Sequence, residues 1–571
     1  MYHKLSKELL VAGKKKVSIG LEDFKTVIDT NSYYVDKTLM IEDLLNGDFM
    51  TGVMQFLRPR RFGKTLMLST LRYFFNIDES DNSYLFDGLA VAKNRALCEK
   101  HQNRYPVVFF TLKGITGNSE ESFLSALNSQ LASEYVRHSE SMAYVLNANE
   151  KEKFLRIKDG KASADDFRSY LSILIGALFR QYRRKPIVLI DEYDVPLNAS
   201  FESGCFDFML DLIRDMFSNG LKTNDSIQAA VITGCLQIAK NQIFTGLNNL
   251  AVHTVTDVLF SEYFGFTEDE TLEMLRYYCI DSRNCDVRKN YDGYCIGGNS
   301  LYNPFSLLNF ISRAIVSKSA ECGNYWVSTS GNAQLSQMLS FSSEDPLLKD
   351  QFERLLGGQS IQASVDQSVV YDSMMDNNGA IMGTLLFSGY LTADHSCGNG
   401  EYLLRIPNME VLSCFRVLAA ECNKTASRVK TPILLQAFLD ENINKAEEYL
   451  DSLFGSILRS RDKTARESSY HFFLAAVLAM NPLPDWKFSS QDQGIKGFAD
   501  FVLTNRTNDA IIIEEKAVSR LNEIRSAAVD ALKQIDERKY SADYLSAGYN
   551  VKEYAIVYFD NTAHIFSKSS I

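Results

Sequence analysis

The fold of this chain is decided by the stretch Phe56-Leu57-Arg58-Pro59-Arg60-Arg61-Phe62-Gly63-Lys64-Thr65, which follows an apolar run and leads into residues 66–75, whose apolar positions have helical spacing. Strand, turn, Gly-Lys-Thr and helix form the context in which a phosphate-binding loop works. Backbone N–H groups and the helix N-terminus there hold phosphate oxygens, the lysine reaches the outer phosphates, and the threonine hydroxyl binds Mg²⁺. Arg58 stands where the full motif has its first glycine, so only the second half fits strictly. Because Gly-Lys-Thr also arises by chance in loops, other features of the chain must decide whether this stretch is a phosphate-binding loop.

Length and composition describe an ordinary globular chain of several domains. Its 571 residues exceed the roughly 250–300 at which one hydrophobic core stops growing, and its content of 46% hydrophobic and 23% charged residues is typical. No apolar run approaches the roughly 18–20 residues of a membrane-spanning helix, and the first residues lack a signal-peptide apolar region. We therefore expect a cytoplasmic protein with no membrane partner.

Cysteine usage and net charge narrow the class further. The ten cysteines include no Cys-x-x-Cys pair, which predicts reduced core thiols in a reducing cytoplasm rather than disulfides or structural zinc. The net charge of −11 means that bulk electrostatics do not indicate nucleic-acid binding. Any such binding has to rest on local basic patches.

A second apolar strand ends in carboxylates. Residues 187–190 are four apolar β-formers, and Asp191 and Glu192 follow directly. Ligands lie at the carboxyl edge of an open parallel sheet, so Asp191 would hold the Mg²⁺ hydration shell and Glu192 would polarise the attacking water. The alternative is a strand that ends in a solvated acidic loop. With Gly-Lys-Thr upstream, we favour the functional interpretation.

A third apolar strand, residues 229–234, should lie beside the others and carries Thr233 at its tip, placed to sense the γ-phosphate. Lys240 is a second candidate phosphate contact, although a solvated helix lysine explains it equally well. A mostly helical stretch at 120–182 separates the strands. Parallel strands joined by helices predict a phosphate-loop ATPase domain over about residues 15–260.

The motifs of this region resemble a bacterial family, the AAA-ATPase-like proteins, whose members typically carry a PD-(D/E)XK nuclease domain at the C-terminus. The motifs are Tyr34-Val35-Asp36-Lys37-Thr38, residues 58–65, Ile190-Asp191-Glu192-Tyr193-Asp194 and residues 243–249. An arginine at position 58 is usual in the family, so it no longer counts against the loop. The resemblance implies an ATP site formed by Arg58, Arg60, Arg61, Phe62, Gly63, Lys64, Thr65, Asp191 and Thr233, with Mg²⁺ on Thr65 and Asp191. The family usually has Leu-Arg where this chain has Leu236-Gln237, which predicts slower or differently controlled hydrolysis.

Residues 261–450 indicate less chemistry. Thr267 is expected to cap a helix that has Glu270 at its third position. Aromatic, turn-rich stretches that also resemble the family lie at 291–305, 325–332 and 386–392. We interpret the region as a helical lid with a winged-helix-like part. Aromatic loops can grip nucleic acid but more often pack a core, so no site residue is assigned here.

The strongest spacing argument lies in the last hundred or so residues. Residues 497–503 and 510–516 are predicted to be two strands joined by a turn centred on Thr507. Asp500 and Glu514 are equidistant from that centre. A symmetric antiparallel hairpin would therefore set these two carboxylates opposite each other.

The neighbouring charges suggest metal-dependent chemistry. Lys516 shares the face of Glu514, whereas Glu515 points to the other face. Opposed carboxylates repel unless a cation such as Mg²⁺ lies between them, and a nearby lysine can orient or deprotonate a water for attack on a phosphodiester. The alternative is a solvated hairpin with an ion pair between Glu514 and Lys516, which leaves the matching register of the acids unexplained.

This hairpin resembles the active site of the PD-(D/E)XK nucleases. The resemblance implies Asp500, Glu514 and Glu467 as metal-binding acids, and Asp500, Glu514, Lys516 and Gln534 as catalytic residues. Tyr540 matches the second member of a downstream polar pair that begins with Gln534. The family usually has an arginine where this chain has Phe498. Loss of that arginine would weaken binding of the nucleic-acid backbone without removing the metal site.

We expect a mixed α/β chain in three parts: an AAA-like P-loop NTPase domain with a parallel sheet (1–260), a helical lid and winged-helix-like middle region (261–450), and a restriction-endonuclease-like α/β domain (451–571). The leading hypothesis is an ATPase, with Glu192 in catalysis, coupled to Mg²⁺-dependent cleavage of nucleic acid, with DNA as the expected substrate, in defence or mobile-element control. The rival is an ATP-driven switch whose nuclease-like domain binds nucleic acid or protein without cutting. A third hypothesis is nucleotide binding without turnover. Assembly with further copies of the chain is left open.

Overall fold

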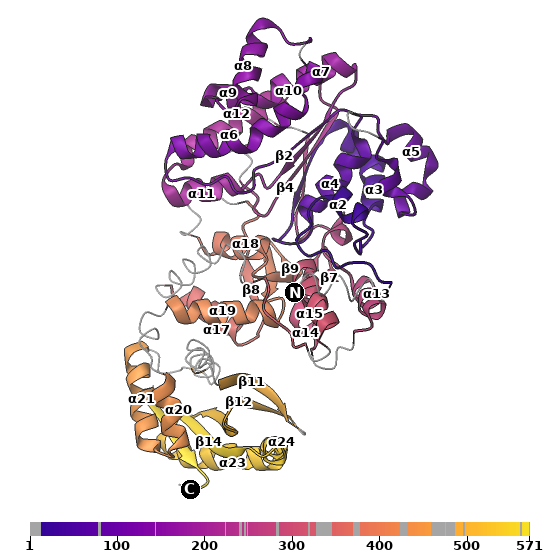
Figure 1. The fold of residues 1–571 in the computed structure, drawn as a ribbon. Coiled ribbons are helices and arrows are strands. Elements are labelled where there is room, and N and C mark those ends of the chain that lie inside the picture. Colours follow the sequence, from indigo (N-terminus) through magenta and orange to yellow (C-terminus); the bar gives the residue numbers. More distant parts are fainter. Residues whose placement is uncertain are drawn as a thin grey trace. The chain divides into compact units, whose positions relative to one another are not determined.

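The computed structural model describes residues 13–77, 81–142, 144–222, 224–238, 243–244, 247, 249–280, 285–317, 320–326, 345–368, 377–422, 431–457, 474, 486–494, 497–559 and 562–569. The chain divides into two compact units (Figure 1). The first comprises Met1–Thr329 and Gln362–Glu410, and the second comprises Ser330–Ile361 and Val411–Ile571. Both are mixed α/β structures, as the sequence predicts.

A five-stranded parallel sheet forms the centre of the first unit. Its strands are β1 (Val53–Leu57), β2 (Val107–Thr111), β3 (Ile187–Asp191), β4 (Ala229–Gly234) and β5 (Leu250–His253), in the order β2-β3-β4-β1-β5. The predicted strands are therefore confirmed, and β4 lies between the strand of the phosphate loop and the strand of the acids. Because all five strands are parallel, their carboxyl ends meet at one edge, where open α/β sheets bind ligands.

Helices cover both faces of this sheet (Figure 1). One group is α2 (Phe24–Asp29), α3 (Leu39–Asn46), α4 (Lys64–Phe75) and α5 (Arg95–His101). The other is α6 (Glu120–Arg137), α7 (Ser139–Met142), α8 (Ala148–Lys158), α9 (Ala164–Arg168), α10 (Tyr170–Tyr182), α11 (Val195–Ser203) and α12 (Phe206–Leu221). In α6 a capping box at Ser119 starts the helix, and Phe123, Leu127 and Leu131 turn one apolar face into the core.

The middle of the chain adds small elements to the first unit. They are α13 (Glu268–Tyr278), α14 (Val287–Tyr291), β6 (Tyr294–Ile296), β7 (Asn299–Leu301), α15 (Pro304–Val316), β8 (Ile361–Ser364), α18 (Asn378–Ser388), β9 (Thr392–Gly398) and β10 (Glu401–Arg405). β6 pairs with β7, and β8, β10 and β9 form a three-stranded sheet. Thr267 caps α13 in a capping box with Glu270, which confirms that prediction.

One expectation about the cysteines is wrong. The sequence predicts reduced thiols throughout, but Cys285 and Cys322 form a disulfide with their Cα atoms 5.2 Å apart. They are 37 residues apart, and packing of α14 against α15 brings the flanking segments together, so no short spacing motif marks the pair. The other cysteines whose side chains the structure describes lie outside this disulfide; they are Cys98, Cys205, Cys235, Cys279, Cys295, Cys397 and Cys414.

The second unit is built on another five-stranded sheet. Its strands are β11 (Trp486–Gly494), β12 (Gly497–Asn505), β13 (Asp509–Ala517), β14 (Asn550–Phe559) and β15 (Thr562–Ser567), in sequence order. Only the β13–β14 pair is parallel. The helices are α17 (Pro346–Leu356), α19 (Met409–Cys422), α20 (Thr431–Leu439), α21 (Ile443–Ile457), α23 (Ile524–Arg538) and α24 (Ala542–Ser546).

Side chains of β12, β13 and β14 alternate between two cores in this unit. Phe501 and Ile513 pack with α20 and α21 on one face, whereas Val502 and Ile512 pack with α23 on the other. This arrangement places the hairpin of β12 and β13 at the centre of the sheet. Within the described part of the chain, no helix is long and apolar enough to cross a membrane.

Candidate functional site

The phosphate loop is curled around the ammonium group of Lys64. Its Nζ donates hydrogen bonds to the carbonyl oxygens of Arg58 (3.0 Å) and Pro59 (3.1 Å) and lies 3.2 Å from Cys235 Sγ. Gly63 adopts a left-handed conformation (φ 86°), which a glycine tolerates without strain, and α4 begins at the next residue. The N-terminus of α4 therefore follows directly on the loop, as the phosphate-binding motif requires.

The side chain of Arg58 is buried in the protein and does not point into the phosphate loop. Its guanidinium is fully buried, and Nη1 donates to the carbonyl oxygens of Leu57 (2.9 Å), His253 (2.9 Å) and Thr254 (2.7 Å). Burial lowers its pKa to about 10. The side chain thus ties β1 to the end of β5, and Arg58 faces the loop through its backbone.

Asp191 gathers three hydroxyl groups at the carboxyl edge of the sheet. Thr65 donates to Asp191 Oδ2 at 2.8 Å, Thr111 donates to the same oxygen at 3.2 Å, and Thr233 donates to Oδ1 at 2.7 Å. Burial, and after it the charge of Glu192, raises the pKa of the Asp191 carboxyl. The contact with Thr65 brings the phosphate loop and the acid strand together as the sequence predicts. A carboxylate and hydroxyl oxygens are hard donors that suit Mg²⁺.

Glu192 and Arg60 lie at the same edge. Glu192 has a left-handed backbone (φ 51°), and its side chain is half-buried. Burial disfavours the charged form of Arg60, but the acidic groups around it outweigh that effect and raise its pKa; these groups are Cys235, Tyr390, Asp194 and Glu192. Arg60 therefore brings a cation close to the predicted catalytic acid.

The remaining loop residues pack against the middle of the chain. The ring of Phe62 is buried, and its centroid lies 4.9 Å from that of Tyr294 in β6. The guanidinium of Arg61 lies 4.8 Å from the ring centroid of Phe305 in α15. A Cβ added to Gly389, at the end of α18, would lie 2.7 Å from Pro59 Cβ. Contacts with β6, α15 and the end of α18 therefore hold the phosphate loop, in addition to the hydrogen bonds that Lys64 makes within it.

The hairpin in the second unit has the predicted register. Phe501 lies opposite Ile513 and Val502 opposite Ile512, and Asp500 and Glu514 are the next residues beyond the Phe501–Ile513 pair. The backbone N–H of Glu515 donates to Asp500 Oδ2 at 2.8 Å, so the Asp500 side chain lies against this end of β13. Both carboxylates therefore lie in one place at the centre of the sheet.

Glu514 is the buried member of this group. Its carboxyl is 1% exposed, and burial together with the charge of Asp500 raises its pKa to about 7. Lys516 Nζ lies 3.6 Å from Glu514 Oε1, and Gln534 in α23 donates to the same oxygen. Oε2 is buried without a hydrogen-bond partner in the described structure. A buried carboxylate with an unused oxygen beside a second carboxylate is a donor set that fits Mg²⁺.

Comparison with known families agrees with both geometries. Residues 18–244 match the family model described as AAA-ATPase-like, a predicted AAA-ATPase, and residues 465–568 match the PD-(D/E)XK nuclease superfamily. The chain joins an AAA-ATPase-like domain to a PD-(D/E)XK nuclease-superfamily domain. The resemblance predicted from the sequence is thereby confirmed at both ends. The chain is also 25% identical over 408 residues, 70% of its length and 68% of the relative's, to an uncharacterized protein in the vnfD 5′ region of Azotobacter chroococcum mcd 1.

Two predicted residues lie outside the part of the chain that the structure describes. Glu467 of the nuclease-superfamily domain and Lys240 of the AAA-ATPase-like domain fall outside the described residues. Among the residues that are described, no group of three or more His, Cys, Asp or Glu side chains could hold a metal ion. Tyr540 is buried near α23, and its hydroxyl has no partner in the described structure.

Sequence reasoning missed several residues of the AAA-ATPase-like domain. Asp194 is buried and accepts hydrogen bonds from the backbone N–H groups of Cys235 (3.0 Å) and Leu236 (2.9 Å), which fixes the turn after β4. Thr111 pairs with Asp191 in the β2–β3 register, so its place at the strand tip was a readable signal. No such signal marked the contact between Cys235 and Lys64, because a lone cysteine after a strand is most often a buried core residue.

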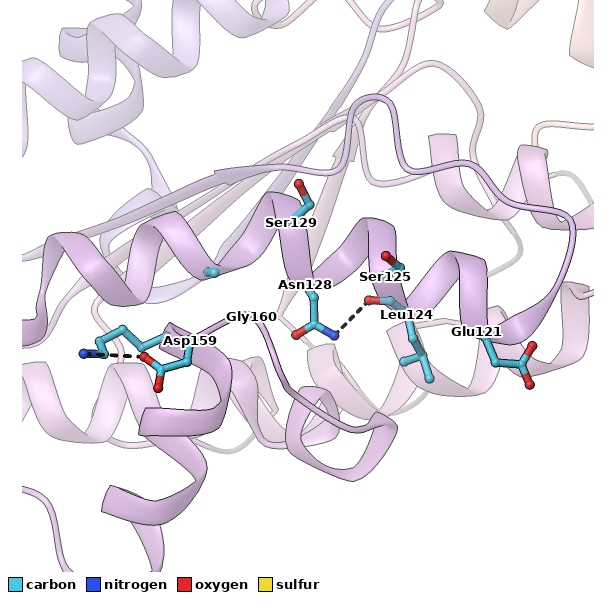
Figure 2. A pocket seen from close by; sticks show the side chains of 9 residues that line it. Glu121, Leu124, Ser125, Asn128, Ser129, Asp159 and Gly160 are labelled. Atoms are coloured by element: carbon cyan, nitrogen blue, oxygen red, sulfur yellow. Dashed lines mark hydrogen bonds and ion pairs between the residues drawn. The ribbon is translucent and has the colours of Figure 1, made fainter.

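A groove of about 670 Å³ lies elsewhere in this domain, along α6 (Figure 2). Residues of α6, the last residue of α8 and the turn after it line the groove: Glu121, Leu124, Ser125, Asn128, Ser129, Ala132, Lys158, Asp159 and Gly160. Asn128 is engaged in holding this turn, because it exchanges hydrogen bonds with the backbone of Ala162 at 2.8 and 3.0 Å. The groove contains none of the predicted site residues.

Proposed function

We propose that residues 1–260 bind and hydrolyse ATP between the phosphate loop and the acids of β3. The observation that carries this proposal is the 2.8 Å hydrogen bond from Thr65 to Asp191. When ATP binds, Lys64 gives up its hydrogen bonds to the loop carbonyl oxygens and binds the outer phosphates instead. Thr65 and Asp191 hold the metal. A Mg²⁺ ion bound there would stabilise charge on the outer phosphates.

In this proposal Glu192 polarises the attacking water. Thr233, which donates a hydrogen bond to Asp191, senses the γ-phosphate. Arg60 supplies the cation that Gln237 cannot, since its neighbours include Glu192 and Asp194. A cation in this position stabilises the charge that develops on the transferred phosphoryl group. This role makes Arg60 a determinant of turnover more than of nucleotide affinity.

We propose further that residues 451–571 cleave nucleic acid, with DNA as the expected substrate. Asp500 and Glu514, joined by Glu467, hold Mg²⁺, whose chemistry is to activate a water and to stabilise the leaving oxygen. Lys516 orients that water, and Gln534 fixes Glu514 through the hydrogen bond from α23. Residues 261–450 include a helical lid that ATP hydrolysis switches, and ATP turnover controls the cleavage. The setting is the cytoplasm, in defence or mobile-element control; self-assembly of the chain is left open.

The second candidate function is an ATP-driven switch whose C-terminal domain binds nucleic acid or protein without cutting. Phe498 in place of the family arginine, Gln237 and the net charge of −11 favour it. A cleavage assay with plasmid and RNA, ATP and Mg²⁺ separates the two functions. The matched pair is Lys516→Ala and Lys533→Ala, because Lys533 is an exposed lysine of α23 paired with Glu537 at 3.6 Å.

We expect the wild type and Lys533→Ala to cut, and Lys516→Ala to lose at least about 100-fold in rate, as removal of a proton-transferring side chain does. If all three proteins leave DNA and RNA intact, the switch is the better description. If Lys64→Ala cuts as fast as the wild type in saturating ATP, cleavage is independent of the nucleotide.

A further inference from the structure

Three charged side chains from separate segments meet beside the phosphate loop. Lys113 Nζ lies 2.6 and 2.8 Å from the two carboxylate oxygens of Glu22, and Arg61 Nη1 lies 3.8 Å from one of them. Glu22 precedes α2, Arg61 belongs to the phosphate loop, and Lys113 follows β2 by two residues. One acid thus holds two cations, and the cluster carries a net positive charge.

The cluster borders the proposed metal site. The backbone N–H of Lys113 donates to Thr111 Oγ1 at 3.1 Å, and that hydroxyl donates to Asp191. Arg61 stands two residues before Gly63 in the loop. The two cations therefore lie next to the residues proposed to hold the phosphates and Mg²⁺, one on the loop and one at the tip of β2.

The segment that carries Glu22 is fixed to the helix of the phosphate loop. Asp23 caps α2 through the N–H of Thr26 (2.8 Å) and accepts from Ser69 (3.3 Å) and Tyr73 (3.0 Å), both on α4. The backbone N–H of Phe24 donates to Ser69 Oγ at 2.9 Å. Glu22 is therefore held near Arg61 by its neighbours and not only by its own ion pairs.

Stability does not explain this arrangement. The side chains of Lys113, Glu22 and Arg61 are 44%, 39% and 35% exposed, and ion pairs this exposed contribute little to folding. A cationic pair shared by one carboxylate is better satisfied by a phosphate, which offers more charge and more acceptor oxygens. A triphosphate in the loop and the carboxylate of Glu22 are thus rivals for the same two cations.

We propose that Lys113 and Arg61 form a second phosphate-binding pair and that Glu22 is a built-in competitor which ATP displaces when it binds. The inference rests on the proposed ATP site and assigns new roles to Lys113 and Glu22. It implies that ATP binding frees the Glu22 side chain from Lys113 and Arg61, while Asp23 keeps the backbone of this segment on α4. Nucleotide affinity is then set by the difference between two sets of ion pairs, and it depends on salt.

The test is calorimetric titration of the full chain with Mg·ATP and with Mg·ADP. The variants are Glu22→Gln, Lys113→Ala and both together, with Lys64→Ala as the control for the ATP site itself. Lys25→Ala is the matched control for charge, since Lys25 is an exposed lysine on α2 that pairs with Asp29 at 3.2 Å. Titrations repeated at low and at high salt follow the exchange of ion pairs.

We expect Glu22→Gln to bind ATP about three- to tenfold more tightly and Lys113→Ala to bind it about three- to tenfold more weakly, with Lys25→Ala unchanged. ATP affinity should fall more steeply with salt in Glu22→Gln than in the wild type, because binding to the variant forms ion pairs without first breaking any. If the wild type binds ATP, Lys64→Ala does not, and both cluster variants match the wild type, the competitor role is overturned while the ATP site stands. If the wild type binds no nucleotide, the ATP site itself is wrong.

Discussion

Thr65 Oγ1 donates a hydrogen bond of 2.8 Å to Asp191 Oδ2 across 126 residues of sequence. β4 lies between the two strands that precede these residues, so the contact forms at the carboxyl edge of the sheet and not between neighbouring strands. One hydroxyl and one carboxylate thereby combine the phosphate loop and the acid strand into a single candidate metal site. Substitutions at either end of this contact should change Mg²⁺-dependent nucleotide binding first.

Replacing Thr65 tests this contact directly. Thr65→Ala removes the hydroxyl, so we expect the gain in ATP affinity that Mg²⁺ provides to fall by about tenfold, which is the effect of about 1.4 kcal/mol. Thr65→Ser keeps an oxygen in place and should bind nearly as the wild type does. Titrations with and without Mg²⁺ measure the difference. Equal Mg²⁺ dependence in Thr65→Ala and wild type would remove Thr65 from the metal site.

Arg58 leads to a prediction that runs against the motif. Arg58→Gly restores the usual phosphate-loop sequence, yet it leaves the carbonyl oxygens of His253 and Thr254 without their buried donor. We expect the free energy of unfolding to fall by about 3–5 kcal/mol, because each buried carbonyl oxygen left without a donor costs about 1–3 kcal/mol. Arg288→Ala, at an arginine 74% exposed, should change it by less than about 0.5 kcal/mol. Urea unfolding of both variants measures the effect, and a stabilised Arg58→Gly would contradict the structural role.

Glu192 should affect turnover and leave binding intact. Glu192→Gln keeps the size of the side chain but cannot polarise water, so we expect phosphate release to fall at least about 100-fold while ATP affinity stays within about threefold. The control is Glu152→Gln, a glutamate 73% exposed on α8. Measured phosphate release and ATP titration on the same samples separate the two effects. A Glu192→Gln protein that hydrolyses ATP at the wild-type rate would exclude Glu192 from the mechanism.

Much of this architecture could be predicted because its signals are local. Buried strands such as residues 187–191 are continuous apolar runs, and the symmetric spacing of Asp500 and Glu514 about their turn specified the hairpin register. What could not be predicted depends on tertiary contacts. The guanidinium of Arg58 binds carbonyl groups almost 200 residues away, and Glu22 meets Lys113 in a fold where Asp23 holds the segment before α2 on α4. Side-chain direction at such positions is decided by the packed fold, which no spacing reveals.

The pH dependence of stability tests the environment of Glu514. Its pKa is raised from 4.5 to about 7, so the folded state holds a proton that the unfolded state releases between those values. The contribution of this carboxyl to stability is therefore fully present below about pH 4.5 and is lost as the pH rises to 7, with a total change of about 3 kcal/mol. In Glu514→Gln this loss is absent. The variant should thus be more stable than the wild type at pH 8 in a chelator, but not at pH 4.5.

The chain offers a selective probe for that measurement. Its two tryptophans are Trp326 and Trp486, and Trp486 lies in β11 of the second unit, so Trp326→Phe leaves a single reporter on the sheet that carries Glu514. In this background, urea unfolding at pH 5 and pH 8 compares Glu514→Gln with Glu537→Gln, a control at a glutamate 65% exposed. Mg²⁺ at pH 8 should stabilise the parent and Glu537→Gln, because it binds the ionised carboxylates, and should have little effect on Glu514→Gln. Equal stabilisation of all three proteins by Mg²⁺ would locate the metal away from Asp500 and Glu514.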